Sequence, residues 1–114
     1  MIGLFLNLLD TQSEKDKFTA LYEKYKNLLY YIAFSKVHNN EVAEECVQET
    51  FFYVAKHFDK IGKVDSSKTK GYLAAVVTGF AIDYYNKEYN GIIINTTVVP
   101  ERIAEEYFQY ILLI

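Results

Sequence analysis

Apolar residues recur at helical spacing along three successive segments of the chain, which predicts three main helices. The first segment follows polar residues 10–13 and runs to about His38, the second runs from Glu41 to about Ile61, and the third from about Lys68 to Tyr89. Their apolar stripes are Phe18, Leu21, Tyr22, Tyr25, Leu28, Leu29 and Ile32; Val42, Cys46, Val47, Phe51, Val54 and Phe58; and Tyr72, Leu73, Val76, Val77, Phe80, Ala81 and Tyr84. The pattern predicts an all-α bundle.

Polar residues that can cap helices precede each of these segments. Glu14 follows Thr11 by three residues, which is the spacing of a capping box, where each side chain bonds the other's backbone N–H. Asn40 is expected to cap the second helix, and Ser66 or Ser67 the third. These caps divide the chain into helices joined by short turns.

The two ends of the chain have patterns of their own. Residues 1–9 are apolar around most of a helical circumference and predict a short N-terminal helix. Residues 92–99 are rich in β-branched side chains, which favour an extended linker or an edge strand open to another chain. A last amphipathic helix is expected after them. We therefore expect a main domain at 1–90 and an appended segment at 91–114.

Composition narrows the class of protein. The 114 residues suit one domain, and 51% hydrophobic with 24% charged residues is a globular balance. The net charge of −3 excludes a globally basic nucleic-acid binder but leaves room for a local basic face. The single cysteine excludes an internal disulfide framework. The apolar start lacks signal-peptide features and the roughly twenty residues of a membrane span, so we expect a cytoplasmic protein without membrane contact.

The chain lacks the motifs of common catalytic and cofactor sites. It has neither a phosphate-binding loop nor a glycine-rich dinucleotide turn. Neither His38 nor His57 has a glutamate three residues before it, as helical di-iron sites require. Cys46 lies on an apolar stripe, where packing is a better interpretation than nucleophilic catalysis. We therefore expect no enzyme activity, no metal and no cofactor.

The second predicted helix carries an excess of acidic side chains. Residues 41–61 contain five acids and two bases. Glu41, Glu45 and Glu49 repeat every four residues, a spacing at which like charges cost about 0.2–0.5 kcal/mol per pair. A helix N-terminus favours carboxylates in its first turn, but Glu49 lies about two turns in. This acidic stripe is either a solvated face or a docking surface for a basic partner helix.

The segment that contains this stripe reads AEECVQETFFYVAKHFDKI and resembles the core-binding helix of bacterial RNA polymerase sigma factors. The family pattern is close to A-E-D-L-V-Q-E-x-F, and the matching residues are Ala43, Glu44, Glu45, Val47, Gln48, Glu49 and Phe51. The neighbouring stretches LYEKYKNLLYYIA and KTKGYLAAVVTGFAIDYY are similar to the family's preceding and following helices. The resemblance covers roughly residues 15–90 and is greatest to the extracytoplasmic-function subgroup.

The resemblance implies a sigma region 2 fold and a role in transcription initiation. The acidic helix would dock on the clamp helices of the polymerase β′ subunit, through Glu44, Glu45, Gln48 and Glu49. The last main helix and the loop before it would recognise and melt the promoter −10 element. The candidate DNA-binding residues are Lys68, Lys70, Tyr72, Tyr84, Tyr85 and Lys87. Regulation by an anti-sigma factor is also implied.

Departures from the family concern the promoter-binding half of this prediction. Thr78-Gly79 stands where many relatives have Arg-Asn or Glu-Asn, and residues 62–90 carry a net charge of only +1. The segment 91–114 is too short for the family's −35-reading domain, so we expect either a truncated chain or a terminal helix that packs on this domain or on another copy. Two alternatives stay open. One is a polymerase-binding regulator that does not initiate, and the other is a helical domain that dimerises through 91–114.

Overall fold

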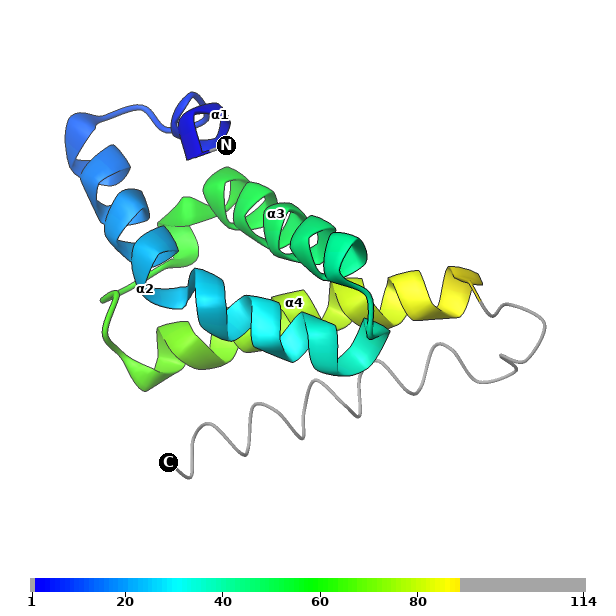
Figure 1. Cartoon of the computed structure of the whole chain (residues 1–114). Coiled ribbons are helices and arrows are strands. Elements are labelled where there is room, and N and C mark those ends of the chain that lie inside the picture. The colour runs from blue at the N-terminus through cyan, green and yellow to red at the C-terminus, as the bar shows by residue number, and fades with distance from the viewer. Residues whose placement is uncertain (1, 89–114) are drawn as a thin grey trace.

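Three long helices pack against one another and enclose the core (Figure 1). The computed structural model describes residues 2–88. Its elements are α1 (Ile2–Leu6), α2 (Gln12–Val37), α3 (Asn40–Lys56), the 3-10 helix η1 (Phe58–Lys60) and α4 (Ser67–Glu88). Each long helix contacts the other two, and α1 lies against α2 and α3. The predicted all-α fold with three main helices and a short N-terminal helix is confirmed.

Side-chain caps define where α2 and α4 begin. Thr11 Oγ1 accepts a hydrogen bond from the Glu14 backbone N–H at 3.1 Å, and the Glu14 carboxylate accepts one from the Thr11 N–H at 3.2 Å. This is the predicted capping box. Ser66 Oγ accepts a hydrogen bond from the Thr69 N–H at 3.1 Å, so Ser66 is the cap of α4, one of the two residues expected.

Both predicted ends of α3 need correction. Asn39, rather than Asn40, accepts the capping bond from the Val42 N–H at 3.1 Å, and Asn40 is already helical. At the other end, α3 stops at Lys56 instead of about Ile61, and η1 follows. The tighter turn redirects the chain towards α4 while its apolar side chains stay in the core. An apolar periodicity that continues through the turn could not reveal this change in backbone hydrogen bonding.

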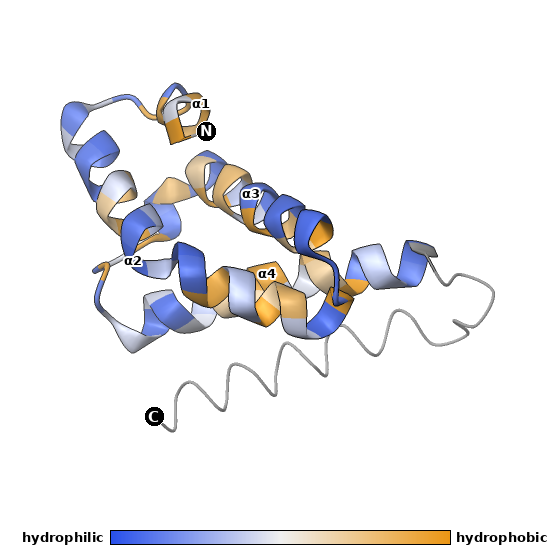
Figure 2. Ribbon diagram, viewed as in Figure 1, coloured by the Kyte–Doolittle hydropathy of each residue, from blue (hydrophilic) through white to orange (hydrophobic). Residues whose placement is uncertain are grey.

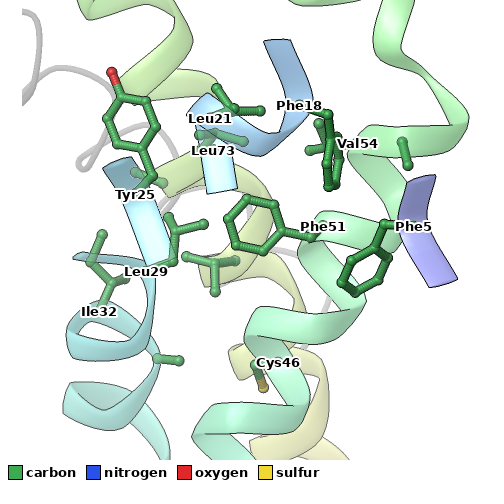
Figure 3. Packing of buried hydrophobic residues seen from close by; sticks show 14 of the residues in the cluster. Phe5, Phe18, Leu21, Tyr25, Leu29, Ile32, Cys46, Phe51, Val54 and Leu73 are labelled. Carbon is green, nitrogen blue, oxygen red and sulfur yellow. The ribbon is translucent and has the colours of Figure 1, made fainter. Parts of the chain in front are cut away.

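Buried side chains from all four α-helices form one core (Figure 3). Phe51 has no exposed surface, and its ring centroid lies 4.8 Å from that of Tyr22 and 6.0 Å from that of Phe18. Phe5 of α1 joins the same cluster, 5.8 Å from the Phe18 ring. The predicted stripes face this core, with their margins half-buried at Tyr22, Leu28, Val47, Tyr72, Val76, Phe80 and Tyr84.

Some of the sequence predictions concern residues beyond the described part. Tyr89, the predicted end of the third main helix, and the segment 91–114, with its expected strand and final helix, lie outside residues 2–88. Within the described residues, no helix is long and apolar enough to cross a membrane.

Candidate functional site

The four residues of the acidic helix singled out from sequence lie on the solvent side of α3. All four are exposed, and the opposite side of the helix faces the core. They are Glu44, Glu45, Gln48 and Glu49. Among residues 2–88 none of the three carboxylates forms an ion pair with a lysine. The structure therefore brings these four side chains to one surface and leaves the three carboxylates without an ion-pair partner in the described residues.

Cys46 lies on the buried side of the same helix. Its pKa is raised to about 11, chiefly because burial disfavours the charged thiolate and further because Glu45 and Glu49 are close. A thiol that stays protonated at neutral pH is a poor nucleophile. Cys46 is thus a packing residue, as its position on an apolar stripe indicated.

Sequence reasoning missed that α1 lies beside Glu45, Gln48 and Glu49 of α3. The Phe5 side chain of α1 is buried, whereas that of Leu4 is 66% exposed. The two helices enclose an open groove of about 640 Å³, lined by Leu4, Phe5, Glu45, Gln48, Glu49 and Phe52. Figure 2 shows α1 largely in the hydrophobic colour, whereas the ribbon of α3 alternates between hydrophilic and hydrophobic colours. The sequence held a signal for this groove, because residues 1–9 are apolar on nearly every side. A helix that buries a single face needs fewer apolar residues.

Two of the candidate DNA-binding residues come together at the start of α4. Lys68 is exposed and Tyr72 is half-buried, and both line a pocket of about 240 Å³. Its lining is Asp59, Lys60, Ile61, Gly62, Ser66, Lys68, Thr69 and Tyr72. Burial, and after it the neighbouring Tyr53, raises the pKa of the Tyr72 hydroxyl. Lys70 is half-buried and does not line this pocket.

The loop beside this pocket is held by α2. Lys17 Nζ donates a hydrogen bond to the Ile61 carbonyl at 2.6 Å, and the Tyr25 hydroxyl donates one to the Val64 carbonyl at 2.6 Å. Lys24 Nζ lies 3.0 Å from the Asp65 carboxylate. Because these bonds come from one rigid helix, the loop between η1 and α4 has a defined position next to Lys68 and Tyr72.

The other three candidates lie at the far end of α4. Tyr84 is twelve positions after Tyr72, which is about 18 Å along a helix. Tyr84 packs partly against the core, and Tyr85 is 47% exposed. Lys87 Nζ lies 3.3 Å from the Asp83 carboxylate in an exposed pair. The six predicted residues are therefore spread along α4 and do not form one site.

Thr78 and Gly79, where the sequence departs from the sigma pattern, lie in the middle of α4. Thr78 is fully buried, and its hydroxyl has no hydrogen-bond partner among residues 2–88. Apart from its chain neighbours and the surrounding backbone of α4, a Cβ added at Gly79 would meet no atom of the described residues within 4 Å. Thr78 therefore offers no surface to a ligand.

Among the described residues no three His, Cys, Asp or Glu side chains are grouped as metal ligands would be.

Comparison with known proteins places most of the chain in one family. The family described as Sigma-70 region 2 matches residues 21–90, which is more than half of the chain. The match includes most of α2 and all of α3 and α4, while α1 and the start of α2 precede it. No curated protein and no solved structure matches the chain.

Proposed function

Since this chain belongs to the Sigma-70 region 2 family, with a sigma-factor-like role in transcription initiation, we propose that it binds core RNA polymerase through the outer face of α3. The partner surface is the pair of clamp helices of the β′ subunit, as the resemblance implies. The observation that carries the proposal is the row of exposed carboxylates at Glu44, Glu45 and Glu49, which have no ion-pair partner among the described residues.

The chemistry of these side chains fits a basic helical partner. Carboxylates accept charge-assisted hydrogen bonds from arginine, in single or bidentate geometry. Gln48 adds an amide that can both donate and accept. The i, i+4 repulsion between Glu45 and Glu49 opposes folding slightly and is relieved when cations of a partner lie between them. The proposal therefore explains why the chain keeps a charge pattern that its own fold does not need.

A charge-reversal experiment tests the docking surface. The double variant Glu45→Lys/Glu49→Lys is expected to bind bacterial core RNA polymerase at least a hundredfold more weakly, because attraction becomes repulsion at the contact. The control Asp16→Lys/Glu23→Lys makes the same change in net charge on exposed positions of α2 and is expected to bind as the unmodified chain does. Unchanged affinity of the α3 variant in a binding titration would reject the assignment.

The start of α4 supports a second step, recognition of the promoter −10 element. A lysine beside a half-buried tyrosine in a small pocket suits an unpaired base next to its phosphate. Lys68 and Tyr72 are the residues we propose for this contact, and Lys60 also lines the pocket. Because residues 62–90 carry a net charge of only +1, binding to phosphates alone is weak, and DNA binding is expected only in the polymerase complex.

Lys68→Glu and Lys87→Glu form a matched pair for this step. Lys68→Glu is expected to weaken binding of a single-stranded −10 oligonucleotide to the polymerase complex about tenfold, measured by fluorescence anisotropy. Lys87→Glu, at the far end of α4, is expected to change it by less than twofold. If the unmodified chain binds polymerase but its complex does not bind the oligonucleotide, the chain is a polymerase-binding regulator that does not initiate.

A further inference from the structure

We propose that α1 forms an apolar half of the polymerase-docking surface, so that the helix bound by the acidic stripe also inserts an apolar side chain between α1 and α3. The inference rests on the proposed function, because both surfaces meet the same partner. The occupant is a basic helix in which an aliphatic or aromatic side chain lies within one turn of an arginine or lysine.

The first support is that α1 is firmly attached to the domain. Phe5 is only 4% exposed, and its ring centroid lies 5.8 Å from that of Phe18 and 6.4 Å from that of Phe51 (Figure 3). The Phe52 ring is 6.5 Å away. Leu9, just after the helix, is also buried. This anchoring gives the rest of α1 a defined place beside α3.

The second support is the composition of the groove between the two helices. Leu4 and Phe52 present apolar surface on its two sides and are 66% and 41% exposed. Glu45 and Glu49 stand at the same groove with no ion-pair partner among residues 2–88. Exposed apolar surface beside carboxylates favours a ligand that is apolar and cationic at once. An acidic or purely apolar helix would leave one half of the groove without a partner.

The third support is that the acidic stripe alone does not explain Leu4. An aliphatic side chain two-thirds exposed contributes little to folding, and α1 is already held through Phe5. Contact with an apolar side chain of the partner would remove the surface of Leu4 and that of the partner side chain from water. The groove therefore adds to the charged contact a component that salt does not screen.

Leu4→Ser and Leu8→Ser are the matched variants for the test. Both residues are exposed leucines near the N-terminus, at 66% and 41%, but only Leu4 lines the groove. In a titration of bacterial core RNA polymerase with the full chain, Leu4→Ser is expected to raise the dissociation constant about tenfold, and Leu8→Ser less than twofold. The slope of affinity against salt concentration should stay unchanged in Leu4→Ser, whereas it should change in Glu45→Lys/Glu49→Lys.

The outcomes separate this inference from the proposed function. If Leu4→Ser binds normally while Glu45→Lys/Glu49→Lys loses binding, the α1 contact is overturned and the acidic docking surface stands. If neither variant loses affinity, both are overturned. Equal losses in Leu4→Ser and Leu8→Ser would also overturn the α1 contact, because they would indicate a general effect on the N-terminal segment. Leu4→Met should restore affinity if an apolar contact is what Leu4 provides.

Discussion

The outer face of α3 and the surface of α4 both carry candidate binding residues, but folding arranges them differently. On α3, four such residues occupy neighbouring turns and all are exposed. On α4, six are spread over most of the helix, and they range from exposed Lys68 to half-buried Tyr72 and Tyr84. A stripe that repeats at helical spacing stays together however the helix packs. Residues scattered along a helix form a site only where the neighbouring elements happen to leave them open.

The inner side of α3 is what keeps the acidic stripe in place, and Phe51 is its central residue. Phe51→Ala is expected to lower the free energy of unfolding by about 3–5 kcal/mol, because it removes a fully buried ring and leaves a cavity. The control Phe52→Ala, at the next position but 41% exposed, should cost about 1 kcal/mol or less. Urea denaturation followed by circular dichroism measures both. A cost below 1 kcal/mol for Phe51→Ala would contradict the observed orientation of α3.

The thiol of Cys46 offers a second probe of how closely α3 is packed. With its pKa raised to about 11, the fraction of reactive thiolate at pH 8 is about a hundredfold lower than for an ordinary cysteine of pKa about 9. Modification by a maleimide should therefore be at least a hundredfold slower in the folded protein than in urea. Rapid modification of the native protein would mean that α3 separates from α2 and α4 often enough to expose the Cys46 thiol.

The same thiol makes a small contribution to the pH dependence of stability. Its pKa is higher in the folded state than the usual 9.0, so the folded state holds the proton more tightly. This contribution is complete below about pH 9 and is lost as the pH rises towards 11. Cys46→Ala should show a shallower loss of stability over that interval. An identical slope in both proteins would contradict the raised pKa.

Helix phase and the caps of α2 and α4 were predictable from the sequence because they depend on residues within a few positions of one another, whereas at α3 the cap is Asn39 and not the neighbouring Asn40. The capping box at Thr11 and the burial of Phe51 are examples. The end of α3 at Lys56 was not predictable, since apolar spacing continues into η1 while the backbone bonding changes. The groove beside α1 was not predictable either, because it requires contacts between residues about forty positions apart. The acidic side of the candidate site could thus be found from the sequence, and its apolar side could not.

The smallest effect expected is that of single surface carboxylates on the free energy of unfolding, and it compares α3 with α2. Glu49→Gln is expected to raise the free energy of unfolding by about 0.2–0.5 kcal/mol, because it removes repulsion from Glu45 one turn earlier. Glu23→Gln on α2 should lower it by a similar amount, because Glu23 lies 3.0 Å from Lys26 in an ion pair. Urea denaturation at low salt should resolve the opposite signs, and 1 M salt should remove both differences. If Glu49→Gln is destabilising, the carboxylate of Glu49 has a favourable partner in the folded chain. The acidic stripe would then serve the domain's own stability, and the physical reason for assigning it to a partner would be lost.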